Sequence, residues 1–183
     1  MQSKEELEKA RERVIEAISQ NMNLYGVTPS VGRLWGLLYF QNHPMTLDEM
    51  KNELGMSKTS MSTSVRHLMD LNMVDKVWKK GNRKDLYVAE EDWYKTFVDF
   101  FSIKWRNSVA DNVNAIDKSL NELNQLIESP GISEEMESEI KSDMAKLHQA
   151  LDYYEWLNRL IDSFESEEIF KYIPKRTEDH TNS

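Results

Sequence analysis

Hydroxyl-bearing and basic side chains are concentrated in one short stretch of the chain, residues 57–87. This stretch holds seven Lys and Arg residues and three Asp residues, a net charge of +4, whereas the whole chain of 183 residues carries −9. Lys and Arg neutralise the phosphates of a nucleic-acid backbone, and hydroxyl groups bond to phosphates and base edges. The other 152 residues sum to −13, so the charge is polarised along the chain and the stretch predicts a site for double-stranded DNA.

A helix that begins after a Ser57 cap would carry the first group of candidate residues. At about 100° per residue, Met61, Val65 and Leu68 share one face, and the hydroxyls and an Arg lie on the other. Such a face of small hydroxyls and one Arg fits a major groove about 12 Å wide. The residues of this helix predicted to contact DNA are Ser57, Lys58, Thr59, Ser60, Ser62, Thr63 and Arg66.

A second group of basic residues surrounds a predicted β-hairpin turn. Two β-prone runs, Val74 to Trp78 and Leu86 to Val88, are joined through the pair Gly81-Asn82, which suits a tight turn. A hairpin with basic residues can straddle a DNA backbone or reach into a minor groove. A salt bridge from Asp85 would orient the nearby Arg, although an exposed pair contributes little to stability. The basic residues predicted for this wing are Lys79, Lys80, Arg83 and Lys84.

Helix signals place both groups in one lobe. Thr46 reads as the cap of a short helix that ends at Gly55, where a left-handed residue is favoured. Thr28 and Pro29 open an earlier helix that continues to about Phe40. A winged helix-turn-helix has the order helix, Gly-containing turn, helix and hairpin. The sequence predicts this fold over residues 27–90.

Long helices are expected on both sides of this lobe. They run from about Glu5 to Leu24, from Glu91 to about Glu128, and from a Ser133 cap through Phe164. The middle one would be roughly 57 Å long at 1.5 Å per residue, so it is expected to pack against a partner helix. The predicted fold is mainly α: a winged helix-turn-helix lobe with a small β-hairpin wing, and long N- and C-terminal helices that form a dimerisation region. The predicted boundaries are residues 1–26 for the N-terminal dimerisation helix, 91–173 for the helical dimerisation region and 174–183 for a flexible tail.

The sequence lacks the patterns of catalytic, metal and cofactor sites. It has no Cys, which excludes disulfides, thiolate zinc sites and Cys nucleophiles. Its four His residues are scattered, and there is no HExxH, Walker loop or Gly-rich dinucleotide turn, so we expect no enzyme, no metal and no cofactor. The N-terminus is charged, and no window approaches about 18 consecutive apolar residues. We expect a soluble cytoplasmic protein that has no membrane partner.

Four runs of the sequence resemble the GbsR branch of the MarR superfamily of winged-helix regulators: Tyr25 to Leu34, Thr46 to Asp70, Val77 to Tyr87, and Tyr154 to Leu157. The likeness extends to about Pro174. It implies a homodimeric repressor that binds an inverted-repeat operator near genes for uptake or synthesis of compatible solutes such as glycine betaine, and the best-known members sense choline. It also implies that Thr59, Ser60, Ser62, Thr63 and Arg66 read bases and that Lys79 through Lys84 form the wing.

Aromatic residues provide a candidate effector site. A quaternary ammonium such as choline donates no hydrogen bonds and is bound by aromatic ring faces through cation–π attraction. A spacing of four residues places Trp35 with Tyr39, and Trp93 with Phe97, on common helix faces. The same spacing is also typical of an ordinary core. The predicted ligand-binding residues are Trp35, Tyr39, Trp93, Tyr94 and Phe97.

The acidic balance supports a second hypothesis. Residues 128–170 hold 12 acidic and three basic residues, a charge of −9 that equals the total of the chain. Acidity and a long helix favour a helical protein–protein adaptor in which the winged lobe is only a scaffold. Whether the protein binds DNA distinguishes this adaptor hypothesis from that of a DNA-binding regulator.

Overall fold

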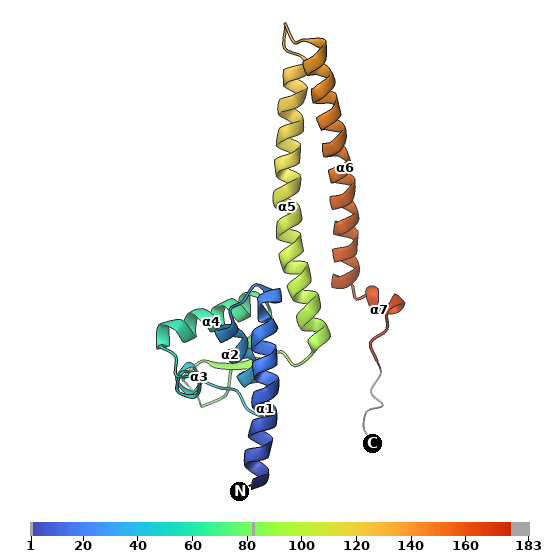
Figure 1. The fold of residues 1–183 in the computed structure, drawn as a ribbon. Helices are drawn as coiled ribbons and strands as arrows, with labels where there is room; N and C mark the ends of the chain where they lie inside the picture. Colours follow the sequence, from blue (N-terminus) through green and yellow to red (C-terminus); the bar gives the residue numbers. More distant parts are fainter. Residues whose placement is uncertain (1, 82, 177–183) are drawn as a thin grey trace. The chain divides into compact units, whose positions relative to one another are not determined.

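A computed structural model describes residues 2–81 and 83–176 (Figure 1). It has two compact units, Met1–Phe100 and Phe101–Ser183. The elements are α1 (Gln2–Asn21), the 3-10 helix η1 (Met22–Tyr25), α2 (Pro29–Tyr39), α3 (Leu47–Leu54), α4 (Lys58–Asp70), β1 (Val74–Val77), β2 (Leu86–Ala89), α5 (Trp93–Ile127), α6 (Glu134–Glu165) and α7 (Ile169–Tyr172). The predicted fold class, mainly α with a winged helix-turn-helix and a small antiparallel hairpin, is confirmed.

Side-chain caps fix where α3 and α4 begin. The Thr46 hydroxyl accepts a hydrogen bond from the Glu49 amide at 3.3 Å, and the Glu49 carboxylate accepts one from the Thr46 amide at 2.7 Å, which completes a capping box. The hydrogen bonds from Thr46 lower the pKa of Glu49. Ser57 caps α4 through the Ser60 amide at 3.1 Å, and Gly55 between the helices has φ +63°. These caps confirm the predicted helix starts.

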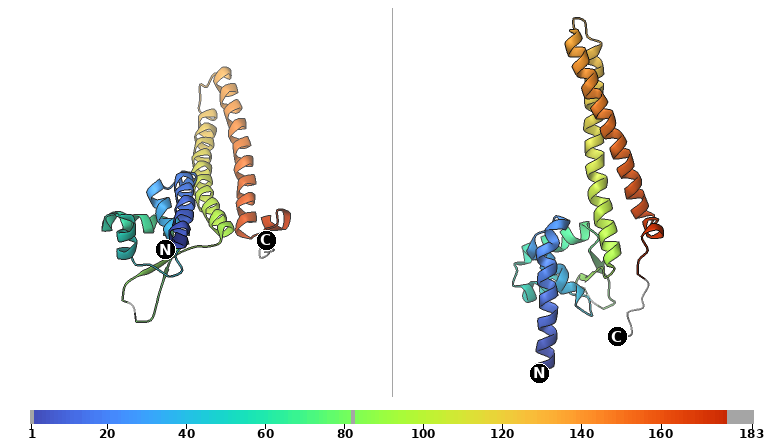
Figure 2. Two further views of the ribbon diagram at one scale, coloured as in Figure 1. Left: turned by 60° about the horizontal axis from the view of Figure 1, so that its bottom comes forward. Right: turned by 45° about the vertical axis from the view of Figure 1, so that its right-hand side comes forward.

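The hairpin loop is longer than the sequence suggested. The last paired residues are Val77 and Leu86, so residues 78–81 and 83–85 lie outside the ladder. Lys80 and Gly81 are in a turn, with φ +88° at Gly81. If pairing continued in this register, Lys79 would face Lys84 and Lys80 would face Arg83, and like charges directly opposite destabilise a sheet. The loop instead projects from the helices of its unit (Figure 2, left). The Asn of the predicted turn, residue 82, lies outside the described residues.

Helix limits also differ from the expected ones. The first helix begins at Gln2 and passes into η1 after Asn21, and Gly26 (φ +67°) then ends it as predicted. The short α7 was not expected, because four residues are too few for an apolar period to be read. Of the predicted tail, residues 177–183 lie outside the described part of the chain.

The core of the first unit is centred on Trp35 of α2. This side chain is 1% exposed, and its indole Nε1 donates a hydrogen bond to the Met73 carbonyl at 3.0 Å. The peptide of Met45 pairs with that of Tyr87 through hydrogen bonds of 2.9 and 2.8 Å, so the segment before α3 is joined to β2. Around Trp35 pack the buried side chains Val31, Leu34, Leu38, Met50, Met61, Val65, Leu68 and Val74.

The second unit is a helical hairpin. α5 and α6 run antiparallel, side by side, in all views (Figures 1 and 2). Val109, Leu157 and Ile161 are buried between them. From α5, Arg106 donates hydrogen bonds to Asp162, Glu165 and Asn158 of α6, and those to Glu165 and Asp162 raise its pKa.

No helix within the described ranges is both long and apolar enough to cross a membrane. The same residues contain no cluster of His, Asp and Glu that would hold a metal ion.

Two glycines let α1 and α2 approach closely. A Cβ atom at Gly32 would lie 2.5 Å from Cγ of Met22 and 3.1 Å from Cα of Ser19. At Gly36 the nearest atom, Cγ2 of Ile15, would be 3.1 Å away. The contact therefore requires glycine at position 32 most strictly.

Gly32→Ala is expected to destabilise the protein. Overpacking of this kind costs about 1–3 kcal/mol, because Met22 or the helix must move. Thermal unfolding followed by circular dichroism should show a lower Tm, whereas the control Ser30→Ala, which changes an exposed residue of the same helix, should unfold like the unmodified protein. An unchanged Tm for Gly32→Ala would contradict the close contact.

Candidate nucleic-acid interface

The exposed face of α4 carries the predicted base-contacting residues. Thr59, Thr63 and Arg66 are exposed, while Met61 and Val65 are buried. Ser57, Lys58 and Ser60 are also exposed at the start of the helix, and Ser62 is half-buried. The structure thus brings all seven residues together on one helix and its cap. Hydroxyls and a guanidinium on a single exposed helix face are suited to phosphates and base edges.

A hollow beside α4 adds two residues that sequence reasoning missed. It has a volume of about 470 Å³ and is bordered by Thr28 and Ser30 at the start of α2 as well as by Thr59, Ser60 and Thr63. The Thr28 side chain forms no cap hydrogen bond, and its hydroxyl instead lies 3.0 Å from that of Ser30. The sequence signal, Thr before Pro, indicates a helix cap only. Hydroxyls at a helix start, where the dipole favours anions, are suited to phosphate.

The wing cations fall into two groups. Lys79, Lys80 and Arg83 are exposed and have no recorded ion pair with any residue that the structure describes. Lys84, in contrast, forms an ion pair with Asp48 at 2.8 Å. Asp85 pairs with Lys76 at 2.8 Å, so the expectation that it orients Arg83 is not met. Asp85 directly precedes β2 and so lies close to Lys76 on the paired strand β1, whereas residue 83 is two positions further into the loop.

Asp48 is an acidic residue within this otherwise basic surface. Its pKa is lowered by a hydrogen bond from Lys84 and by the charges of Lys84, Lys58 and Lys51. The same hydrogen bond raises the pKa of Lys84. The ion pair links the start of α3 to the wing.

Three of the five predicted ligand-binding residues pack ring against ring. The ring centroids of Trp35 and Trp93 are 4.8 Å apart, those of Trp35 and Tyr39 are 5.2 Å apart, and those of Tyr39 and Trp93 are 5.5 Å apart. The Trp93 indole donates a hydrogen bond to the Tyr39 hydroxyl at 3.0 Å. Tyr94 and Phe97 are 45% and 44% exposed. In this conformation Trp35 is buried in the core, whereas the side chains of the other four predicted residues are partly exposed to solvent.

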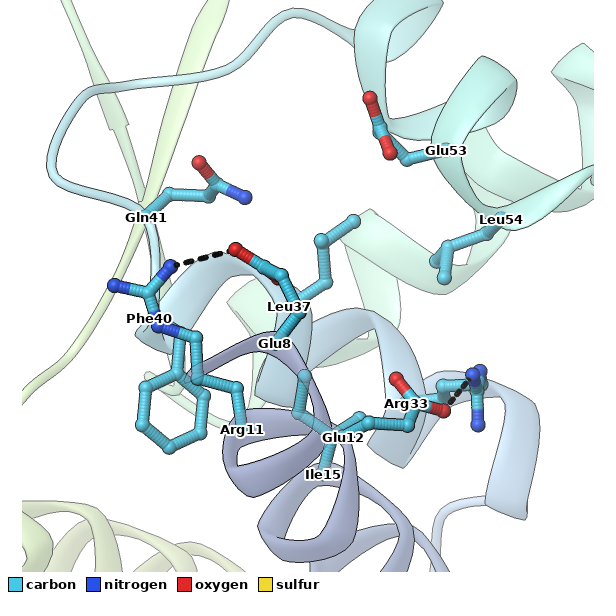
Figure 3. Close-up of a pocket in the computed structure, with 10 residues that line it drawn as sticks. All are labelled: Glu8, Arg11, Glu12, Ile15, Arg33, Leu37, Phe40, Gln41, Glu53 and Leu54. Carbon is cyan, nitrogen blue, oxygen red and sulfur yellow. Dashed lines mark hydrogen bonds and ion pairs between the residues drawn. The ribbon is translucent and has the colours of Figure 1, made fainter. Parts of the chain in front are cut away.

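A polar pocket of about 190 Å³ lies between α1, α2 and α3 (Figure 3). Its charged groups largely pair with one another, since Arg11 binds Glu8 at 3.5 Å and Arg33 binds Glu12. Arg33 also binds Glu16 at 3.0 Å. Exposed pairs of this kind contribute roughly 0–1 kcal/mol each. The pocket is lined by none of the predicted site residues, and the ion pairs of Arg33 join α2 to α1.

The arrangement defines a class of protein. A short capped helix, a turn at glycine, a second helix with an exposed polar face and a basic hairpin together make a winged helix-turn-helix DNA-binding protein. A crystal structure described as that of a transcriptional regulator matches this chain with a TM-score of 0.62 at 16% sequence identity, over 87% of this chain and 98% of that one. At this identity the match shows the fold alone.

Sequence relatives identify the family. The repressor OpcR of Bacillus subtilis (strain 168) is 43% identical over 172 residues, 94% of this chain and 93% of that protein. The repressor GbsR of the same organism is 44% identical over 175 residues, 93% of this chain and 94% of that protein. A model of the GbsR family transcriptional regulator, C-terminal helical hairpin, matches residues 93–171. The chain belongs to the GbsR family.

The resemblance predicted from sequence is therefore confirmed. The chain is a DNA-binding transcriptional repressor of the helix-turn-helix type. Transcriptional regulators are a non-enzymatic class, which confirms that this is not an enzyme.

Asp48→Asn is expected to strengthen DNA binding. The substitution removes a negative charge from the basic surface and releases Lys84, which can then neutralise one more phosphate. The slope of log affinity against log salt should steepen by about 0.9. Fluorescence anisotropy of a labelled duplex at several salt concentrations measures both effects.

Asp75→Asn is the matched control, because it makes the same change of charge on β1 at a residue without a recorded ion pair in the described ranges. A salt slope that is equal for the two variants would show that Lys84 does not gain a phosphate.

Proposed function

We propose that the protein represses genes for uptake or synthesis of compatible solutes, such as glycine betaine, by binding an inverted-repeat operator as a homodimer. The observation that carries the DNA contacts is the exposed hydroxyl and Arg face of α4, in the same unit as the exposed wing cations Lys79, Lys80 and Arg83. The names of the relatives OpcR and GbsR, both repressors, support repression. The family gives no support to the adaptor alternative.

In this proposal the two DNA elements have different roles. α4 enters the major groove, where Thr59, Ser62, Thr63 and Arg66 read base edges. Ser57, Lys58 and Ser60 at its start bind phosphate. The wing residues Lys79, Lys80 and Arg83 bind the backbone or the minor groove, and Lys84 joins them when it leaves its carboxylate partner.

Unpartnered apolar side chains support the homodimer. Leu7 and Val14 of α1 are 49% and 44% exposed, and Trp156 of α6 is 49% exposed. Helices with this much exposed apolar surface are typical of protein–protein interfaces. We assign dimerisation to residues 1–26 and 91–173. Two recognition helices about 34 Å apart would match half-sites one helical turn apart.

Aromatic surface in the first unit supports an effector site for a quaternary ammonium such as choline. Tyr39, Trp93, Tyr94 and Phe97 present ring surface near one another in sequence or in space, and ring faces attract such cations. A bound cation regulates DNA binding only if it prefers one arrangement of the dimer over another. We place the protein in the cytoplasm, where its DNA is.

Arg66→Ala is expected to weaken binding to the operator by about 1–3 kcal/mol and to relax base preference at one position. Lys79→Ala should weaken binding to every sequence and reduce the salt slope by about 0.9. Anisotropy titrations with operator and scrambled duplexes distinguish the two. Arg159→Ala, on the exposed surface of α6, is the control for loss of one positive charge. If Arg66→Ala behaved like Lys79→Ala, the guanidinium would not read a base.

Choline is expected to release heat on binding and to lower operator affinity, and Trp93→Ala should abolish both effects while leaving DNA binding without choline intact. Isothermal titration calorimetry and anisotropy provide the two readouts. Tyr25→Phe, which changes an aromatic residue of the same unit whose ring packs against Phe100, outside the predicted set, is the control. No heat and no loss of affinity in the unmodified protein would remove choline as the effector.

A further inference from the structure

Trp78 is the first residue after β1, and its side chain is 80% exposed. The other four Trp residues are between 1% and 49% exposed. No hydrogen bond or ring contact of Trp78 is recorded with the residues that the structure describes. A covered aromatic side chain buries about 150–250 Å². The wing therefore carries a large apolar side chain that remains mostly exposed to solvent.

The surroundings of Trp78 are strongly charged. It borders a hollow of about 480 Å³ in the wing together with Lys76, Val77, Arg83, Lys84 and Asp85. Lys76 and Asp85 neutralise each other at 2.8 Å, and Arg83 has no recorded ion pair in the described ranges. Lys79 follows the Trp directly in the sequence. A flat apolar side chain with cations beside it is complementary to a partner that has both apolar edges and regularly spaced anions.

Duplex DNA has this combination. Its deoxyribose rings and base edges are largely apolar, and they lie between phosphates along each strand. Proteins that contact the minor groove commonly insert apolar side chains beside the basic residues that hold the backbone. A partner protein with an acidic apolar patch would also fit, but the exposed face of α4, in the same unit, carries the groups that nucleic acid requires.

We propose that Trp78 is a DNA-contacting residue of the wing, whose indole packs against deoxyribose and base edges in the minor groove while Lys79 and Arg83 bind the flanking phosphates. The inference rests on the proposed operator binding. Sugars and base edges are present in every sequence, so the contact adds affinity to all duplexes and does not read the operator. It also differs from the other wing contacts because it involves no charge.

Three variants test the contact: Trp78→Ala, Trp78→Phe and, as control, His43→Ala, whose side chain is exposed between α2 and α3, outside the proposed DNA contacts and the dimerisation residues. The probes are two short fluorescein-labelled duplexes, one selected from a random library by the unmodified protein and one of scrambled sequence. Trp78→Ala should weaken binding to both by roughly tenfold, because the apolar area that the indole buries against DNA is lost. Trp78→Phe should keep most of the affinity, and His43→Ala all of it.

Salt dependence separates this role from a phosphate contact. Trp78→Ala removes no charge, so its plot of log affinity against log salt should run parallel to that of the unmodified protein. Lys79→Ala should instead lower the slope by about 0.9. A lowered slope for Trp78→Ala would mean that the substitution disturbs the neighbouring cations, and the apolar contact would be wrong.

Incorporated 5-fluorotryptophan gives a direct readout. The fluorine resonance that is absent from Trp78→Phe should shift when either duplex is added. An unmoved resonance, or a Trp78→Ala variant that binds both duplexes as tightly as the unmodified protein, would overturn this inference alone. Failure of the unmodified protein to bind any duplex would overturn the proposed function with it.

Discussion

The backbone of one residue, Met73, sets the geometry of the unit that contains the winged helix-turn-helix. Its carbonyl accepts hydrogen bonds from the Trp35 indole and from the Glu90 amide, both at 3.0 Å, and its amide donates to the Leu68 carbonyl at 2.9 Å. A buried donor without a partner costs about 1–3 kcal/mol, so Trp35 can be buried only where this carbonyl meets it. The end of α4, the start of β1 and the end of β2 are thereby joined to the centre of α2.

Charge is distributed so that little of the surface suits phosphate. The net charge of −9 is the sum of +4 in residues 57–87 and −13 elsewhere. Within the basic part, two lysines of the hairpin already have carboxylate partners, Asp85 and Asp48. The other basic residues of this part are Lys58 and Arg66 of α4 and Lys79, Lys80 and Arg83 of the wing loop. Acidic surface elsewhere repels DNA, so the charge distribution alone favours binding through the basic part.

Local signals made the helices predictable, and long-range packing made the rest unpredictable. Thr46, Ser57 and Ser133 each cap a helix as expected, since a cap depends on residues only three positions apart. The exposed face of α4 followed from its apolar period in the same way. The long hairpin loop depended on which charges would oppose each other across the strands, and the contact of Trp35 with Trp93 depended on segments far apart in the chain. Neither can be read from local sequence.

The contact between Met22 and Gly32 has a consequence for how this family can vary. The Met22 side chain fills the space that a Cβ atom at position 32 would need, so the two positions share one volume. The same Cβ atom would also lie 2.8 Å from Cβ of Met22 and 3.1 Å from the backbone Cα of Ser19, so a shorter side chain at position 22 would not by itself admit alanine at position 32. Position 32 is therefore restricted to glycine by atoms that every non-glycine residue at position 22 retains. The exposed residues of this unit can diverge, while the seam between its first two helices must keep its glycine.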